Sequence, residues 1–156
     1  MRDWKFNHID FSIYPSYEGD DLGVTWTPEK TTVKIWAPTA KMIEFRLFKD
    51  GQTGEAFHKT QLQAVGNGVW STVLMGDYQG KFYTLKINDG EWLTETPDMY
   101  ARCVGVNGKR GLIFDPHKTN PENWENDKGP DLDNFTDAVI YETHVRHFSI
   151  SESSGI

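Results

Sequence analysis

The stretch TTVKIWAPTAKMIEFRLFKDG, residues 31 to 51, predicts two consecutive β-strands. Each half alternates apolar with polar side chains, and the apolar positions are Val33, Ile35 and Ala37 in the first half and Ile43, Phe45 and Leu47 in the second. Because successive side chains of a β-strand point to opposite faces, this period of two predicts two half-buried strands. Pro38 ends the first strand, and Asp50-Gly51 predicts a tight hairpin turn after the second, since Asp-Gly readily supplies positive φ.

Further strands are predicted from the same signals. One covers residues 57 to 65 and ends at Gly66-Asn67-Gly68, and two more cover residues 69 to 76 and 81 to 89. A hairpin is expected around Asn107-Gly108. No stretch shows the apolar repeat at i, i+3, i+4 and i+7 that is typical of a helix. We therefore predict an all-β, immunoglobulin-like β-sandwich of about seven to eight strands over residues 1–115.

The remainder of the chain differs in composition. Residues 116–136 are rich in Pro, Asn and Asp and poor in aliphatic side chains, which predicts a linker over a surface with Trp124 as its one large anchor. Residues 137–156, DAVIYETHVRHFSISESSGI, begin with a β-branched and aromatic run that predicts a buried strand within residues 139–148. This strand has no obvious partner in the sandwich, so we interpret it as the start of a second domain.

Composition and charge exclude several classes of partner. The chain has 156 residues, 13% of them aromatic, and a net charge of −7, which repels nucleic acid and anionic membranes. The single cysteine, Cys103, excludes an internal disulfide. No apolar run approaches the roughly 20 residues of a membrane span. The first residues, MRDWKFNHIDFSIYPS, lack the apolar core of a signal peptide, so a cytoplasmic location is expected.

Three stretches in order resemble the N-terminal part of the type I pullulanases, which are α-glucan debranching enzymes of glycoside hydrolase family 13. They are residues 22–40 with WAPTA, residues 68–115 with DMYA, and residues 137–149 with YETHVRHFS. The resemblance implies that the sandwich is a carbohydrate-binding module of family 48 and that residues 137–156 begin a truncated catalytic (β/α)8 barrel. Two residues depart from the family pattern: Met99 replaces a proline, and His147 replaces an aspartate.

The resemblance also implies an activity for the parent protein, namely hydrolysis of α-1,6-glucosidic bonds in pullulan, glycogen or starch dextrins with retention. That chemistry needs two carboxylates about 5–5.5 Å apart. In the family they lie on later barrel strands, so we expect no catalytic residue here and an inactive fragment. The expected partners are α-glucan and the parent's own barrel. Alternatives are a stand-alone α-glucan-binding module, the N-terminal module of a branching enzyme or isoamylase, and an unrelated immunoglobulin-like interaction domain.

Lys86 and Trp92, in KINDGEW, are the candidate glycan-binding residues. Sugars stack on aromatic faces and a lysine hydrogen-bonds their hydroxyls, and the resemblance implies this role near the Asp89-Gly90 turn. Alternatively, Trp92 packs against its own loop or the barrel. Trp36 and Trp70 lie inside predicted strands and are expected in the core rather than as sugar platforms, with Trp36 between the sheets or at their edge.

Metal and cofactor sites are not expected. His144 and His147 form an H-x-x-H pattern, but residues three apart on a strand point to opposite faces and cannot share an ion unless the segment is helical. Gly19-Asp20-Asp21 lacks the spaced oxygen ligands of a calcium loop and is interpreted as a turn. The surface that would dock the barrel is expected to be apolar, which favours self-association of the chain.

Overall fold

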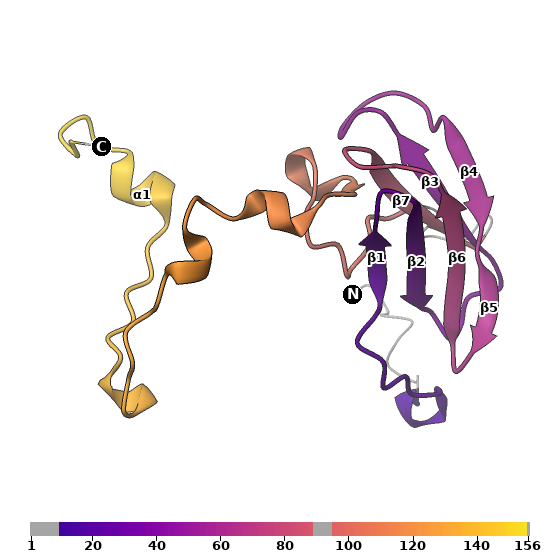
Figure 1. Cartoon of the computed structure of the whole chain (residues 1–156), viewed down its shortest axis with the longest axis horizontal. Helices are drawn as coiled ribbons and strands as arrows, with labels where there is room; N and C mark the ends of the chain where they lie inside the picture. The colour runs from indigo at the N-terminus through magenta and orange to yellow at the C-terminus, as the bar shows by residue number, and fades with distance from the viewer. Residues whose placement is uncertain (1–9, 89–94, 156) are drawn as a thin grey trace, which may run out of the picture. The chain divides into compact units, whose positions relative to one another are not determined.

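A computed structural model describes residues 10–88 and 95–155 and divides the chain into two units, Met1–Thr119 and Asn120–Ile156. The first unit contains two four-stranded antiparallel sheets (Figure 1). Sheet A has the order β1 (Gly23–Trp26), β2 (Lys30–Trp36), β6 (Val69–Met75) and β5 (Gln63–Gly66). Sheet B has the order β4 (His58–Gln61), β3 (Ile43–Phe48), β7 (Phe82–Ile87) and β8 (Gly111–Leu112). The predicted all-β sandwich is confirmed.

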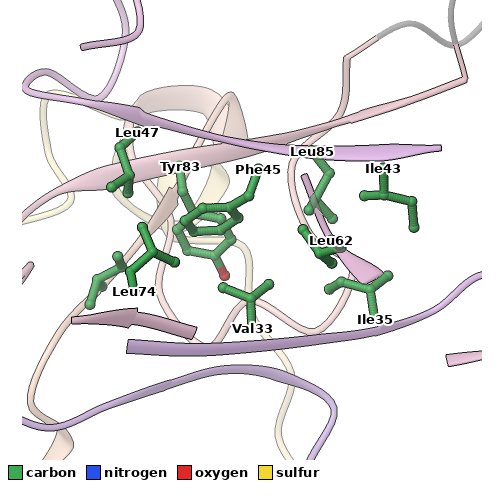
Figure 2. Packing of buried hydrophobic residues seen from close by; sticks show 10 residues of the cluster. Val33, Ile35, Ile43, Phe45, Leu47, Leu62, Leu74, Tyr83 and Leu85 are labelled. Carbon is green, nitrogen blue, oxygen red and sulfur yellow. The ribbon is translucent and has the colours of Figure 1, made fainter. Parts of the chain in front are cut away.

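The two halves of residues 31–51 form a central strand in each sheet. β2 pairs with β6 in sheet A, and β3 pairs with β7 in sheet B. Their inward side chains form the core between the sheets: Val33, Ile35, Ile43, Phe45, Leu47, Tyr83 and Leu85 (Figure 2). Phe45 and Tyr83 stack with ring centroids 5.2 Å apart. Burying such a side chain contributes about 1.5–3 kcal/mol, so the alternation in the sequence is what holds the two sheets together.

The single strand predicted over residues 57 to 65 is wrong. It is two strands, β4 and β5, which lie in different sheets. The chain crosses between the sheets at Leu62, whose side chain is 3% exposed and belongs to the core. Its backbone N–H donates to the Ile43 carbonyl oxygen at 2.8 Å. No glycine or proline marks this crossing, which is why the sequence pattern did not reveal it.

The tight hairpin predicted at Asp50-Gly51 is also wrong, although β3 and β4 are antiparallel neighbours. The connection is a longer loop, and its positive φ of 81° occurs at Gly54. The Asp50 carboxylate instead accepts hydrogen bonds from the N–H groups of Gln52 at 2.8 Å and Thr53 at 2.7 Å. Gly51 is required for packing, because a Cβ there would lie 2.8 Å from the ring of Phe82.

Arg110 fastens this loop to the sandwich. Its guanidinium lies 3.6 Å from the centroid of the Phe48 ring, a cation–π contact. The same group donates hydrogen bonds to the carbonyl oxygens of Asp50 at 2.6 Å, Thr53 at 2.7 Å and Gly54 at 3.0 Å. The loop between β3 and β4 is therefore held by one side chain from a distant part of the sequence.

The hairpin predicted around Asn107-Gly108 is confirmed. Asn107 and Gly108 have φ values of 56° and 65°, and the Lys109 N–H donates to the Val106 carbonyl oxygen at 3.3 Å. Two central residues with positive φ are typical of the type I′ turn that joins antiparallel strands. Short 3-10 helices complete the first unit: η1 (Phe11–Ile13), η2 (Val106–Gly108) and η3 (Pro116–Thr119).

The second unit contains η4 (Trp124–Asn126), η5 (Phe135–Asp137) and α1 (Val145–Ser149). The strand predicted within residues 139–148 is not present: Val139 is 96% exposed and Ile140 is 89% exposed, and neither lies in a strand. A strand needs a neighbour to satisfy its N–H and C=O groups, and no such neighbour is present in the described part of this unit. The assignment of these residues to a barrel stays a prediction. None of the described helices is long and apolar enough to span a membrane.

Candidate functional site

The outer face of sheet B carries six polar side chains from three adjacent strands. Alternation places Tyr83 and Leu85 in the core, so Thr84 and Lys86 on the same strand point to the opposite side. We call the six residues the polar face: Lys59 and Gln61 on β4, Glu44 and Arg46 on β3, and Thr84 and Lys86 on β7. Because all three strands are regular and paired, the positions of these side chains are fixed by the sheet.

The register of the strands arranges the polar face in two rows. Gln61 is directly opposite Glu44, and Glu44 is directly opposite Lys86. The second row contains Lys59, Arg46 and Thr84 in the same order. Neighbouring strands lie about 4.8 Å apart, so each row spans about 10 Å across the sheet.

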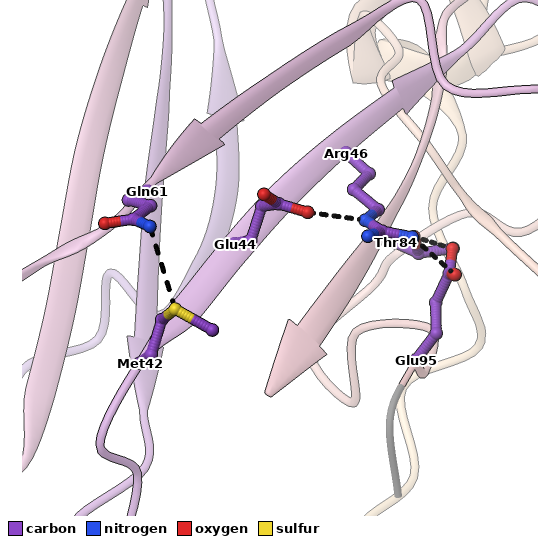
Figure 3. Close-up of polar contacts among 6 residues, drawn as sticks. All are labelled: Met42, Glu44, Arg46, Gln61, Thr84 and Glu95. Atoms are coloured by element: carbon purple, nitrogen blue, oxygen red, sulfur yellow. Dashed lines mark hydrogen bonds and ion pairs between the residues drawn. The ribbon is translucent and has the colours of Figure 1, made fainter. Parts of the chain in front are cut away.

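Arg46 is the centre of an ion-pair network on this face (Figure 3). Its Nε donates to Glu44 Oε1 at 2.7 Å, and its Nη1 donates to Glu95 Oε2 at 3.0 Å. The Thr84 hydroxyl donates to the other oxygen of Glu95 at 2.6 Å. The hydrogen bond to Glu44 raises the pKa of Arg46 above its ordinary value. Both Glu44 and Arg46 are half-buried, so the network fixes the direction of the Glu44 carboxylate.

The first row offers the chemistry to bind a hydroxylated ligand. Gln61 is exposed and provides both an amide donor and a carbonyl acceptor; its amide contacts the Met42 sulfur at 3.7 Å, which is a weak acceptor. Glu44 provides acceptors, and the half-buried Lys86 provides donors. A ligand whose groups both donate and accept hydrogen bonds would fit this row.

The structure describes one of the two predicted glycan-binding residues. Lys86 lies on the polar face near the end of β7, whereas Trp92 lies outside the described residues. Asn88 adopts a φ of 51°, and its Oδ1 accepts the Lys41 N–H at 2.7 Å. This hydrogen bond connects the end of β7 to the residues that precede β3.

The two strand tryptophans take different positions. Trp70 packs against the core, as predicted, and its Nε1 donates to the Ala37 carbonyl oxygen at 3.1 Å. The prediction for Trp36 is wrong, because it follows the buried Ile35 and lies on the outer face of sheet A. Its Nε1 donates to the Pro15 carbonyl oxygen at 3.0 Å, so the segment before β1 partly covers it.

His144 and His147 lie together, contrary to the geometry expected of a strand. His144 is the N-cap of α1 and His147 lies within it, so their rings meet with centroids 4.5 Å apart. Across residues 10–88 and 95–155 there is no group of three or more His, Cys, Asp or Glu side chains that could hold a metal ion. Two histidines alone do not complete the four ligands of a structural zinc site.

Sequence reasoning missed a buried polar pair. Asp98 is 5% exposed and accepts a hydrogen bond from the Tyr83 hydroxyl at 3.0 Å and from the Tyr100 N–H at 2.8 Å. Burial raises the pKa of the Asp98 carboxyl, while both hydrogen bonds act to lower it. Nearby, a cavity of about 90 Å³ is lined by Trp26 and Arg102 among other residues. Asp98 belongs to DMYA, but nothing in that motif marks its side chain as buried.

Residues 21–117 match the model of the family described as carbohydrate-binding module 48 (isoamylase N-terminal domain). The chain is 38% identical to a pullulanase of Bacillus subtilis (strain 168) over 90% of its own length and 18% of the relative's. It is 34% identical to the chloroplastic pullulanase 1 of Arabidopsis thaliana over 89% of its own length and 15% of the relative's.

Solved structures give the same result. A pullulanase from Paenibacillus barengoltzii, solved in complex with maltohexaose and α-cyclodextrin, is 44% identical with a TM-score of 0.81, covering 90% of this chain and 22% of that one. A pullulanase from Bacillus acidopullulyticus is 33% identical with a TM-score of 0.81, covering 92% and 18%. The chain thus spans about a fifth of the length of these relatives. It belongs to the carbohydrate-binding module 48 family and corresponds to the module-bearing part of pullulanase-type proteins.

Proposed function

We propose that this chain is the α-glucan-binding module of a debranching enzyme whose whole protein hydrolyses α-1,6-glucosidic bonds in pullulan, glycogen or starch dextrins. The observation that carries the proposal is the position of Lys86 on the polar face of a module 48 sandwich. The solved relative with maltohexaose and α-cyclodextrin supports the choice of ligand.

Lys86 and Trp92 would divide the binding between them. The Lys86 ammonium donates to sugar hydroxyls, and the Trp92 indole, six positions further along, provides an apolar face for a glucosyl ring. Hydrogen bonds to hydroxyls replace bonds to water and contribute little net affinity, so the stacking contact would supply most of it. We place no catalytic residue in this chain, because the paired carboxylates of a retaining glycosidase would belong to a barrel domain.

A titration with maltohexaose, followed by tryptophan fluorescence, tests glucan binding. We expect a saturable change, and Lys86→Ala should weaken the affinity by about tenfold, which corresponds to about 1.4 kcal/mol. Trp92→Ala removes the reporting indole, so this variant is measured by calorimetry, where we expect no binding. Lys30→Ala is the matched control, because Lys30 is an exposed lysine on the outer face of sheet A. Equal affinities for the wild type and Lys86→Ala would remove Lys86 from the site.

A second role, as a docking platform for the rest of the parent protein, is favoured by one observation. Val73 and Met75 are 50% and 72% exposed on the outer side of β6, which leaves an apolar strip on sheet A. Exposed apolar surface favours association, so we expect the isolated chain to self-associate at high concentration. Sedimentation of Val73→Lys beside the wild type checks this: the variant should stay monomeric, whereas identical sedimentation would argue against the strip as the contact.

A further inference from the structure

Lys86 does not stand alone on sheet B, because it ends a row that begins at Gln61 and passes through Glu44. We infer that Gln61 and Glu44 contact the same glucan chain as Lys86, and that Arg46 positions the Glu44 carboxylate for that contact. The inference rests on the proposed function and extends it from one lysine to a row that selects the class of glycan.

The row has the geometry of a linear site. Its three residues occupy directly opposed positions on three neighbouring strands, and all three side chains leave the sheet on the same side. Two interstrand spacings of about 4.8 Å separate the Cα atoms of Gln61 and Lys86 by about 10 Å. That distance suits a short run of linked sugar rings lying across the strands, with one polar side chain for each part of the run.

The chemistry of the row selects a neutral sugar. A hydroxyl both donates and accepts, so it can accept from the Lys86 ammonium, donate to the Glu44 carboxylate, and do either with the Gln61 amide. Within the row the Glu44 carboxylate and the Lys86 ammonium balance each other, and Arg46 offsets Glu95. The chain as a whole carries a net charge of −7, which disfavours an anionic glycan, and Glu44 would repel any carboxylate or sulfate brought next to it.

Arg46 determines where the Glu44 carboxylate points. It binds Oε1 of Glu44 through Nε and is itself held from the other side by Glu95, which the Thr84 hydroxyl anchors. Figure 3 shows the Glu44 side chain between Gln61 and Arg46. Because Arg46 takes Oε1, a sugar hydroxyl would donate to Oε2. Arg46 is therefore a positioning residue that acts on the ligand through Glu44.

Isothermal titration calorimetry of the full chain with maltohexaose tests the row. We expect Gln61→Ala and Glu44→Gln each to weaken binding by about three- to tenfold, the range for one hydrogen bond. Gln63→Ala is the matched control, because Gln63 is an exposed glutamine on sheet A. Arg46→Lys should weaken binding in the wild type and have no effect in the Glu44→Gln background. A melting curve of each variant separates these effects from loss of folding.

A second ligand tests the selectivity. An oligosaccharide of uronic acids should not bind the wild type, and Glu44→Gln should reduce this discrimination. If Lys86→Ala weakens binding of maltohexaose while Gln61→Ala and Glu44→Gln do not, Gln61 and Glu44 do not contact the glucan and the inference is refuted. If maltohexaose binds and none of the three variants matters, the glucan binds another surface and the inference is overturned although glucan binding stands. Absence of wild-type binding at millimolar maltohexaose would refute both.

Discussion

The hydrogen bond between Tyr83 and Asp98 provides the sharpest test of the packing. Tyr83→Phe removes one hydroxyl from a side chain that is 1% exposed and keeps the ring that stacks on Phe45. The Asp98 carboxyl, 5% exposed, then loses one of its two donors in a place that water hardly reaches. Leaving a buried acceptor without its donor costs about 1–3 kcal/mol. For a domain of about 100 residues this lowers Tm by about 4 °C or more.

The effect should depend on pH. Burial raises the pKa of Asp98 in the folded state, so at a pH between the unfolded value of about 3.9 and the folded value only the unfolded state loses its proton. The free energy of unfolding therefore falls as pH rises through this interval, and it is constant above the folded pKa. The Tyr83 hydroxyl opposes this loss by donating to the carboxylate, so the cost of Tyr83→Phe should increase with pH.

Urea denaturation at several pH values measures both effects. Asp98→Asn is the companion variant, because it keeps an acceptor but cannot ionise; the wild type should lose stability relative to it as pH rises from below about 4. Tyr78→Phe is the control, since Tyr78 is a half-buried tyrosine that packs against the same core. A cost for Tyr83→Phe no larger than that for Tyr78→Phe would refute the assigned role of the buried pair.

Three further substitutions test particular elements of the sandwich. Leu62→Ala should destabilise it by about 2–5 kcal/mol in chemical denaturation, because it empties the core where the chain changes sheets; a change below 1 kcal/mol would mean that Leu62 is not in the core. Met99→Pro should stabilise it by about 0.4–1 kcal/mol, because Met99 follows Asp98 in a turn closed by the hydrogen bond from the Ala101 N–H to the Asp98 carbonyl oxygen, where proline is favoured; a lower Tm would refute that turn geometry. Arg110→Ala should speed proteolysis within residues 50–54, since it removes all three guanidinium bonds to the loop; an unchanged cleavage pattern would show that Asp50 alone orders the loop.

Local patterns predicted the strands well and failed where long-range pairing decides the structure. The alternation around Val33 and Phe45 identified β2 and β3, because each strand buries one face. The same pattern predicted β4 and β5 as one strand, because the residues on both sides of Leu62 have strand-like sequence. The tail run at Val139 has strand propensity, but without a partner it forms no strand among the described residues.

The candidate site depended even more on pairing. Lys86 was a candidate because KINDGEW resembles the family's glycan-binding turn, but its neighbours Glu44 and Gln61 lie far from it in the sequence. They meet it only through the registers of β3 with β7 and of β3 with β4, which a single sequence does not specify. Alternation did place Glu44 and Arg46 on the outer face, and this signal was sufficient to find the polar face once the sheet order was known.

Amide chemical shifts of the full chain, followed during a titration with maltohexaose, show which surface binds glucan. We predict saturable shifts concentrated on β3, β4 and β7, and about tenfold more maltohexaose should be needed to saturate them in Lys86→Ala. A spectrum that does not change at millimolar maltohexaose, or shifts confined to sheet A, would contradict glucan binding on the polar face.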